Sequence, residues 1–475
     1  MHFDSKPSIW NIRELLTWLD LNFLPNTDNS DVENYCSFIG AYEVFSMFRG
    51  IVPIVHGPVG CISSYYSTRI ATRLDEKLKP LPFSTCMDNN DVIFGAVEKL
   101  EKTIKEVDQL YHPKLIVILT TCVSDMIKED IDSLTRRLKA EVNADLIYLY
   151  SGGISCKGFR DGANDAFRVL MNYIKDKNTS SRRNPKSVNL FLRRVNGKIS
   201  DNQDLLEIKR MLAVNGIKVN TVVRVGTTYE ELLQIPDAEA NISLCYTYGK
   251  ESMGHLKELF NQPYSTKSYP IGLTGTIQWV KEITGILNLD DRFSNSDEVI
   301  EMEKEITKLK AFLSAKLKEN KMYIWHPGEK GLAFVKLAVD LGMEPFLIGF
   351  TYYLLKATRE TIINLMKDGY DPKVIIRGHS NIWLDHENKY ILNERPLLLM
   401  PKKFWLGNLP CVDIDLFRDN AVGLSGLRNI VKEIYACYCK NNPVDNNSIF
   451  DRYFETRFEK IEWSNKIENL IGKRP

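Results

Sequence analysis

The chain has no long apolar run and almost no excess of charge of either sign. Its 475 residues carry 62 lysines and arginines against 61 aspartates and glutamates, which gives a net charge of +1. Such a balance creates no field that would attract nucleic acid or an anionic membrane surface. No apolar stretch approaches the roughly 20 residues that a membrane-spanning helix needs. The sequence therefore predicts a soluble protein with neither a nucleic-acid nor a membrane partner.

The first residues also lack the apolar core of a signal peptide. Residues 1–6 are mostly polar, which predicts a cytoplasmic protein. In that reducing compartment the nine cysteines should be thiols, which favours metal or redox roles over disulfides. Cys36, Cys61 and Cys122 belong to no Cys-x-x-Cys pair, so the generic ferredoxin and zinc signatures are absent.

Short apolar runs alternate with longer amphipathic stretches along most of the chain, a pattern typical of parallel α/β units. The candidate strands are 115–119, 146–150, 188–192, 219–224, 242–245, 322–325, 345–348, 374–376 and 397–400. One helix is expected over 126–138, where apolar residues recur at helical spacing. We predict an α/β fold of three doubly wound, Rossmann-like domains with parallel sheets around a central cleft.

The length of the chain predicts about three domains, since a domain averages roughly 150 residues. Two segments indicate where these domains meet. A polar linker covers 175–186, and the charged stretch 294–321 reads as a long surface helix. We predict a cluster-binding domain over 1–180 and a cofactor-site domain over 181–320 that ends in the charged helix. A third α/β domain is expected over 321–475.

Three cysteines lie where they could ligate a metal cluster. Cys36 opens an apolar run, Cys61 ends the Gly-rich loop that starts at His56, and Cys122 ends a buried strand. A [4Fe–4S] cluster needs four ligands and is held by thiolates. Glycines before Cys61 would let backbone N–H groups approach an anionic cluster. A helix expected to begin after Asp125 would favour the thiolate form of Cys122.

Ordinary packing is the alternative for each of these cysteines, because free cysteine is among the most buried residue types. Taken singly, each is better explained by packing. Taken together, their positions at strand ends and Gly-rich turns favour an iron–sulfur cluster that takes its remaining ligand from a second chain. Spacing alone does not identify the cluster.

The stretch from Cys36 to Asp132 resembles the first domain of the nitrogenase component 1 family. The matching motifs are Cys36-Ser-Phe-Ile-Gly-Ala, His56-Gly-Pro-Val-Gly-Cys61, Asn90-Asp-Val-Ile-Phe-Gly95, and Thr120-Thr-Cys122 followed by Lys128-Glu-Asp-Ile131. The order and spacing of the three cysteines are most similar to those of the alpha-type subunit of the scaffold that assembles the iron–molybdenum cofactor. The resemblance weakens beyond about residue 290.

This resemblance implies ligands and partners. It makes Cys36, Cys61 and Cys122 ligands of a [4Fe–4S] cluster, as in the scaffold, or of a P-type cluster with eight irons, as in the catalytic protein. The cluster would be completed by a homologous beta-type subunit in an α2β2 heterotetramer. A nucleotide-dependent iron protein would dock over it and deliver electrons, which is oxidoreductase chemistry of the nitrogenase type.

A second site is expected at Cys245, which ends an apolar strand and precedes a helix. This segment resembles the one whose cysteine anchors one end of the iron–molybdenum cofactor in alpha-type subunits. Arg69 resembles the cofactor-pocket arginine of the family, and its guanidinium could pair with an anionic cluster. The resemblance implies that Cys245 and Arg69 bind the iron–molybdenum cofactor or its precursor. The alternatives are a packed thiol and a surface charge; Lys250 and Lys330 could add positive charge or be solvated.

Two cofactor-side histidines of the catalytic alpha subunits have no counterpart here. Neither the stretch 411–426 nor Gly158-Phe-Arg-Asp-Gly162 contains a histidine. A scaffold would tolerate this loss, because fewer protein ligands ease release of the cofactor. The first alternative is a catalytic alpha-type subunit of a nitrogenase or nitrogenase-like reductase. The least favoured alternative is a cluster-free α/β binding protein whose cysteines only pack.

Overall fold

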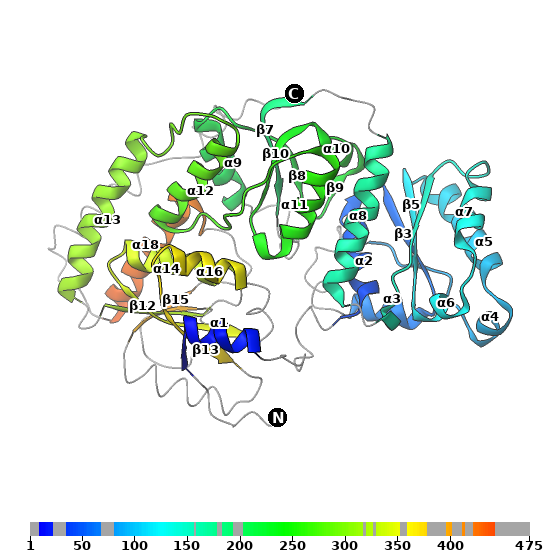
Figure 1. Ribbon diagram of the computed structural model, residues 1–475, viewed down its shortest axis with the longest axis horizontal. Helices are drawn as coiled ribbons and strands as arrows, with labels where there is room; N and C mark the ends of the chain where they lie inside the picture. The colour runs from blue at the N-terminus through cyan, green and yellow to red at the C-terminus, as the bar shows by residue number, and fades with distance from the viewer. Residues whose placement is uncertain are drawn as a thin grey trace. The chain divides into compact units, whose positions relative to one another are not determined.

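The apolar runs of the sequence form strands and the amphipathic stretches form helices (Figure 1). The computed structural model describes residues 9–21, 35–67, 80–155, 158–177, 183–192, 203–316, 320–325, 329–351, 359–377, 396–400, 411–413 and 421–441. Within these ranges, no helix combines the length and the apolar character needed to cross a membrane.

The chain divides into two compact units, and neither is one continuous segment. Unit 1 consists of Met1–Leu24, Asp201–Lys218 and Lys267–Pro475. Unit 2 consists of Pro25–Ser200 and Val219–Thr266. All four cysteines singled out above therefore belong to unit 2. The three-domain division at residues 180 and 320 stays a prediction.

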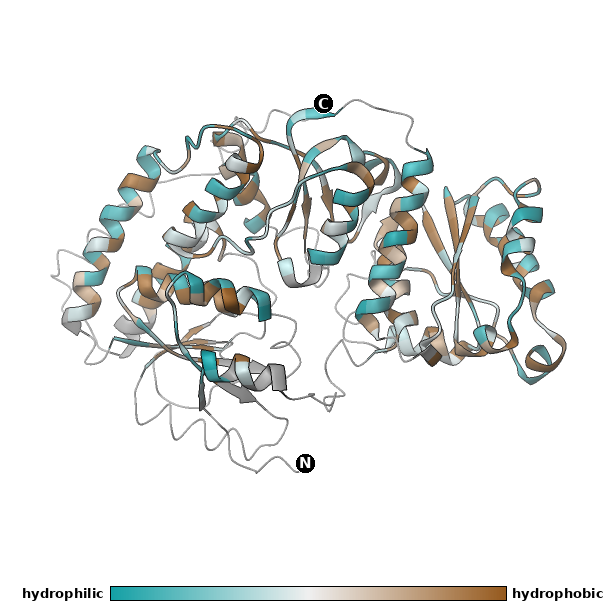
Figure 2. Ribbon diagram, viewed as in Figure 1, coloured by the Kyte–Doolittle hydropathy of each residue, from teal (hydrophilic) through white to brown (hydrophobic). Residues whose placement is uncertain are grey.

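The first sheet of unit 2 is parallel, with the strand order β4-β3-β5-β6. Its strands are β3 (Ile51–His56), β4 (Phe83–Ser84), β5 (Leu115–Thr120) and β6 (Asp145–Leu149). All six residues of β5 are buried, and Figure 2 shows the strands of this sheet largely hydrophobic. The chain leaves β3 for β4 on one side and then returns to β5 on the other. Such a reversal places a binding site at the carboxyl ends of the two central strands, and Cys61 and Cys122 follow those two strands.

The second sheet of unit 2 is also parallel and has the order β10-β7-β8. Its strands are β7 (Asn184–Phe191), β8 (Lys218–Val223) and β10 (Ala238–Ser243). The chain passes from β7 to β8 on one side and then crosses to β10 on the other, so this sheet is doubly wound as well. Cys245 follows β10 directly, at the carboxyl edge of the sheet.

Buried amide side chains cross-link this second sheet. Asn189 of β7 donates to the side chain of Asn241 of β10 at 2.9 Å, and Asn241 donates to Gln262 at 3.0 Å. Asn220 of β8 donates to Asn189 at 2.9 Å from the other side. Asn189, Asn241 and Gln262 are fully buried. Because each is hydrogen-bonded, the network fixes the register of three strands without leaving a buried polar group unpaired.

Replacing Asn241 with leucine should destabilise unit 2. The change keeps the branched shape of the side chain but leaves the Gln262 oxygen and an Asn189 N–H without this partner, and each buried unpaired group costs roughly 1–3 kcal/mol. We expect the free energy of unfolding, measured in urea, to fall by about 3 kcal/mol. Asn184→Ala, at an exposed position on the same network, should change it by less than about 0.5 kcal/mol. Equal losses in the two variants would contradict the role of the buried amides.

Unit 1 contains a six-stranded sheet with the order β1-β13-β12-β11-β14-β15. Its strands are β1 (Ile9–Asn11), β11 (Lys321–Trp325), β12 (Glu344–Thr351), β13 (Lys373–Arg377), β14 (Leu397–Met400) and β15 (Cys411–Asp413). Five of them are parallel and doubly wound about β11 and β14, while β1 adds an antiparallel edge. The predicted fold of doubly wound parallel sheets is confirmed, and β1 is an addition that the sequence did not predict.

The prediction of one continuous helix over 126–138 is wrong, because the chain forms two helices there. They are α6 (Cys122–Ile127) and α7 (Ile131–Leu138). Lys128 ends α6 in the left-handed region, at a φ of 51°. Asp130 then starts α7 by accepting a hydrogen bond from the backbone N–H of Ser133 at 3.0 Å. The predicted charged helix is confirmed as α13 (Asp297–Lys316).

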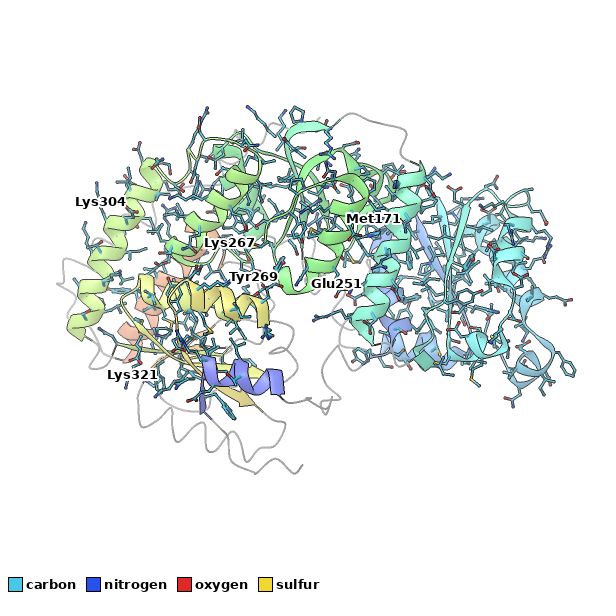
Figure 3. All side chains as sticks on the ribbon, in the orientation of Figure 1. Met171, Glu251, Lys267, Tyr269, Lys304 and Lys321 are labelled. Atoms are coloured by element: carbon cyan, nitrogen blue, oxygen red, sulfur yellow. The ribbon has the colours of Figure 1, made fainter. Side chains whose placement is uncertain are left out.

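Three helices of unit 2 pack in sequence, α2 (Ser37–Ser46) on α8 (Phe159–Lys177) and α8 on α11 (Tyr246–Phe260). The α2–α8 contact is close, because a Cβ built on Gly162 would lie 1.8 Å from the carbonyl oxygen of Ser37. On the α11 side, Asn164 donates to Glu251, and Met171 is fully buried on α8 (Figure 3). Cys36 precedes α2 and Cys245 precedes α11, so α8 supports both helices that follow these cysteines.

Candidate functional site

Each of the three predicted cluster ligands stands at the beginning of a helix. Cys36 is the N-cap residue of α2. Cys61 lies in the first turn of α3 (Val59–Tyr66), which starts after Pro58, so the loop predicted up to Cys61 ends earlier than expected. Cys122 is the first residue of α6, and the helix predicted to start after Asp125 therefore begins sooner.

A capping interaction explains the early start of α6. The backbone N–H of Thr121, the N-cap residue, donates to the Ser124 hydroxyl at 2.8 Å. This bond satisfies one of the backbone N–H groups that a helix start leaves unpaired. Cys122 is thereby fixed within the first turn, directly after β5.

A glycine turn brings Cys36 to Cys122. A Cβ built on Gly153 would lie 2.9 Å from Cys36 Cβ and 3.9 Å from Cys122 Sγ. The turn is held on both sides, because Ser37 donates its hydroxyl to Ser151 O at 2.8 Å and Gly152 N–H donates to Asp125 at 2.9 Å. A side chain at position 153 would occupy the space between the two thiols, which glycine leaves open.

Cys61 lies close enough to the other two thiols for their charges to change its pKa. Burial raises the pKa of the Cys61 thiol, and the neighbouring Cys36 and Cys122 raise it further, while a hydrogen bond with Thr121 opposes them. Like charges that share one site disfavour further ionisation, so the Cys61 thiolate forms less readily beside these two neighbours.

The alkylation of Cys61 in metal-free protein should respond to this environment. A raised pKa means that the reactive thiolate forms only at higher pH, so iodoacetamide should modify Cys61 at a higher pH than it modifies a small free thiol. Cys122→Ser removes one repelling charge and should move the profile part of the way back, since burial remains. Site-resolved mass spectrometry would measure both. A Cys61 profile unchanged by the substitution would show that the two thiols do not interact.

In the ranges given above, no three His, Cys, Asp or Glu side chains are close enough to share one metal ion. Thiolates are the ligands that iron–sulfur clusters use, so the chemistry of the three cysteines fits the predicted cluster. Their role as its ligands stays a prediction.

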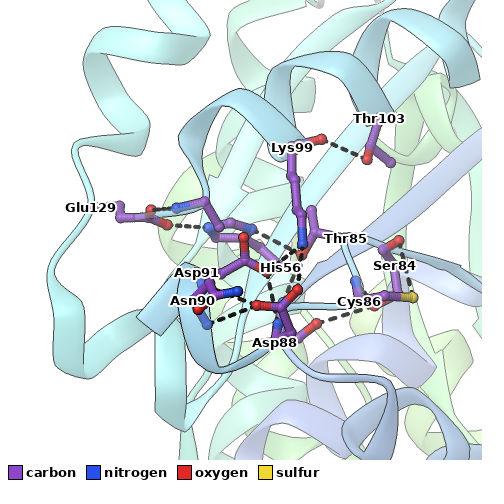
Figure 4. A network of polar contacts seen from close by, with 12 residues as sticks. His56, Ser84, Thr85, Cys86, Asp88, Asn90, Asp91, Lys99, Thr103 and Glu129 are labelled. Atoms are coloured by element: carbon purple, nitrogen blue, oxygen red, sulfur yellow. Dashed lines mark hydrogen bonds and ion pairs between the residues drawn. The ribbon is translucent and has the colours of Figure 1, made fainter. Parts of the chain in front are cut away.

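A network behind the thiols centres on His56, the last residue of β3 (Figure 4). Its ring is fully buried between Thr85 and Glu129. Its backbone carbonyl accepts hydrogen bonds from Ser124 and Thr121, on the α6 side. Both residues stand in the motifs quoted above, where neither was given a role of its own. Nothing in the sequence shows that these two residues meet.

Cys245 stands at the start of α11 and is buried, with 6% of its surface exposed. The hydroxyl of Ser243 donates to the Cys245 carbonyl at 2.9 Å, and Gly249 N–H donates to the same carbonyl at 2.9 Å. These bonds fix the backbone of Cys245 between β10 and α11. The predicted strand–cysteine–helix arrangement is confirmed, whereas the cofactor role of the thiol stays a prediction. Arg69 lies outside the described residues.

The two lysines considered from the sequence differ in exposure. Lys250 is exposed. Lys330, in the first turn of α14 (Glu329–Asp340), is only 7% exposed. Its Nζ lies 5.7 Å from the ring centroid of Tyr269, which Figure 3 labels. Lys330 therefore supplies unit 1 with a buried positive charge held over an aromatic face, where solvent screens it little.

Large apolar side chains are exposed near the cysteines. They lie on α3, α6, the turn at Gly153–Ser155 and α4 (Asn89–Phe94), which packs against α6. Phe94 is 83% exposed and Ile93 72% exposed, and the others are Val59, Val92, Met126 and Ile154. A contiguous patch of exposed apolar groups is typical of a protein interaction surface. We call Ile93 and Phe94 the α4 tip.

Comparisons with known proteins show which family the chain resembles. The family model described as nitrogenase component 1 type oxidoreductase matches residues 36–393. The nitrogenase iron-molybdenum cofactor biosynthesis protein NifE of Clostridium pasteurianum is 26% identical over 414 residues, which cover 84% of this chain and 86% of that protein. The nitrogenase molybdenum-iron protein alpha chain of Methanosarcina barkeri is 25% identical over 332 residues, covering 67% and 60%.

A solved structure shows the same fold. The chain superposes on "Nitrogenase Cp1 at pH 5" with a TM-score of 0.59 over 88% of this chain and 90% of that one. Sequence identity over this superposition is 19%, so the likeness concerns the fold alone. It confirms the α/β architecture expected from the resemblance in the sequence.

Proposed function

Because the chain belongs to the nitrogenase component 1 type oxidoreductase family, we propose that it is the alpha-type subunit of a scaffold for maturation of the iron–molybdenum cofactor. The observation that carries this proposal is the convergence of Cys36, Cys61 and Cys122 from three helix starts around a space kept open by Gly153. Relatives named as the biosynthesis protein NifE support the scaffold role. The missing cofactor-side histidines support it as well.

In this proposal Cys36, Cys61 and Cys122 hold a [4Fe–4S] cluster or half of a P-type cluster. A homologous beta-type subunit supplies the remaining ligand in an α2β2 assembly. The cluster, when bound, accepts single electrons and passes them on. The protein's own residues provide three thiolates, of which Cys36 is exposed and Cys61 and Cys122 are half-buried. Burial of these groups by the proposed partner subunit would limit solvent access and so tune the cluster's potential.

A nucleotide-dependent iron protein is the proposed electron donor, and the α4 tip is the surface proposed for it. Aromatic side chains that are exposed in the free protein and buried in a complex often dominate binding energy. Phe94→Ala should lower the rate of electron delivery from the iron protein by about tenfold or more, since such an anchor contributes at least about 2 kcal/mol. Stopped-flow oxidation of the iron protein would measure it. Leu110→Ala, exposed elsewhere on unit 2, is the control and should leave the rate unchanged.

Cys245 is the proposed anchor of the cofactor precursor, and Arg69 is proposed to balance the precursor's negative charge. The buried position of Cys245 between β10 and α11 supports this, because a thiolate fixed at a strand end suits a ligand that must bind in one orientation. With no histidine from the late segment, the precursor would be released more easily than from a catalytic subunit.

Activation of a cofactor-deficient catalytic protein tests the scaffold role. The complex of this chain with its beta-type partner should activate that protein when incubated with an iron protein, nucleotide and reductant. Cys245→Ala should abolish this transfer while leaving the interface cluster signal in electron paramagnetic resonance intact. Failure to activate, with both cluster signals present, would contradict the scaffold role.

A catalytic nitrogenase-like reductase is the second candidate. The match to a nitrogenase alpha chain and a 25% match to a light-independent protochlorophyllide reductase of Leptolyngbya boryana favour it. It requires substrate turnover by the purified complex with iron protein and reductant. A cluster-free binding protein is the remaining alternative, and it requires that anaerobically purified complex contain no iron.

A further inference from the structure

The contact between His56 and Glu129 is sequestered from solvent, and nothing in the proposed cluster chemistry uses it (Figure 4). The His56 side chain is 0% exposed and that of Glu129 is 6% exposed. His56 Nε2 contacts one Glu129 carboxylate oxygen, and Nδ1 lies 3.2 Å from the Thr85 hydroxyl. Burying a carboxylate is costly, so a fully partnered pair of this kind is better explained by the geometry it fixes than by the stability it adds.

At one end the pair fixes the backbone that carries two of the cluster ligands. The Thr85 hydroxyl, beside the His56 ring, also accepts the backbone N–H of Gly57 at 3.1 Å, at the start of the Cys61 loop. The carbonyl of His56 accepts the hydroxyl of Ser124 at 2.7 Å, two residues after Cys122. A movement of His56 therefore displaces both segments.

At the other end the pair holds the base of the α4 tip. The second carboxylate oxygen of Glu129 accepts the backbone N–H of Ala96. A Cβ built on Gly95 would lie 3.3 Å from the same oxygen. Gly95 and Ala96 follow Phe94 directly, so one carboxylate joins the end of α4 to the His56 ring.

We propose that His56 and Glu129 are positioning residues that couple the α4 tip to the cluster ligands Cys61 and Cys122. Displacement of Gly95 and Ala96 by a bound partner would pass through the Glu129 carboxylate to His56 and from there to both ligand segments. Cys36 lies at the far end of this path, because α2 is joined to it through Ser37, Ser151 and the hydrogen bond from Gly152 N–H to Asp125. The inference rests on the proposed function only for the presence of a cluster.

Thiol reactivity in metal-free protein tests the positioning role. In Glu129→Gln, the rates of alkylation of Cys61 and Cys122 by iodoacetamide should rise about tenfold, the effect of losing one charge-assisted hydrogen bond. The rate at Cys36 should stay unchanged. Glu98→Gln, exposed on α5 (Val97–Tyr111), is the matched control. A uniform change at all three cysteines, or no change at Cys61 and Cys122, would overturn the proposal.

A second variant keeps the test decisive if Glu129→Gln does not fold. Thr85→Val preserves the shape of the side chain but removes the hydroxyl that contacts His56 and accepts Gly57 N–H. It should raise the alkylation rate of Cys61 and leave that of Cys36 unchanged. An unaltered rate at Cys61 in this variant would overturn the proposal as well.

The coupling itself is tested in the cluster-loaded complex with its beta-type partner. Adding saturating iron protein with a non-hydrolysable nucleotide should shift the cluster's midpoint potential in the unmodified protein and not in Glu129→Gln. An equal shift in both would refute the coupling. If the complex contains no iron, the proposed function fails, whereas the alkylation rates still decide the positioning role.

Discussion

Cys61→Ala is expected to remove nearly all cluster iron from the anaerobically co-purified complex. Cys61 is half-buried, as Cys122 is, and lies within reach of the charges of both other thiols. Even a change to an outer partner of a metal site costs about 10–100-fold in affinity, so loss of a direct ligand should lower iron and acid-labile sulfide by at least about tenfold. Iron analysis together with electron paramagnetic resonance would measure the loss.

Cys86→Ala is the control for this experiment. Cys86 is an exposed thiol that follows the carboxyl end of β4, and its Sγ lies 3.7 Å from the backbone oxygen of Ser84. The cluster signal should survive this substitution. Loss of iron in both variants would mean that general unfolding, and not ligand removal, releases the iron. Retention of the full signal in Cys61→Ala would contradict the ligand assignment.

Gly162→Ala is expected to disrupt the cluster-binding part of unit 2 from a position outside the site. The new Cβ would lie 1.8 Å from Ser37 O and 2.6 Å from Ser37 Cα, which real atoms cannot tolerate. Helices α2 and α8 would have to separate, and overpacking of this kind costs about 3 kcal/mol or more. Since Cys36 caps α2, cluster content should fall with stability. Urea unfolding and iron analysis would measure the two effects.

Gly60→Ala provides the comparison, because no atom lies within 4 Å of the Cβ it would add. Gly60 is in α3, where alanine is favoured over glycine by up to about 1 kcal/mol. This variant should be as stable as the unmodified protein or slightly more so. If Gly162→Ala behaved in the same way, the close α2–α8 contact would not be needed.

The fold could be predicted where a local sequence pattern reflects how a segment is buried. The run at β5 is apolar at nearly every position because the strand is covered on both faces, and its bounds were predicted closely. The start of α3 was missed, since Gly57, Pro58 and Gly60 together indicate a loop. In fact Pro58 takes an extended N-cap conformation, which proline adopts readily, and the helix begins one residue later.

The candidate site could be predicted only in part. The three cysteines were found from motifs, yet their mutual approach depends on the switch in strand order between β3 and β5. The contact between His56 and Glu129 spans 73 residues and has no periodicity that a sequence could reveal. The edge strand β1 pairs with β13 in the same way, across more than three hundred residues. Long-range pairing of short segments follows from packing and leaves no local pattern.

Unit 2 is built from two separated chain segments, so its parts are synthesised at different times. The part that carries Cys36, Cys61 and Cys122 lies before residue 200, but the apolar core of the unit also uses Val223, Leu232, Met253 and Leu256. The three thiols thus leave the ribosome well before the side chains that complete the core beneath them. Until this later segment has been synthesised, the cluster ligands of a nascent chain would lie on an incompletely folded core. Iron is therefore best delivered after translation has passed residue 266, and delivery before then would risk trapping the thiols in the wrong arrangement.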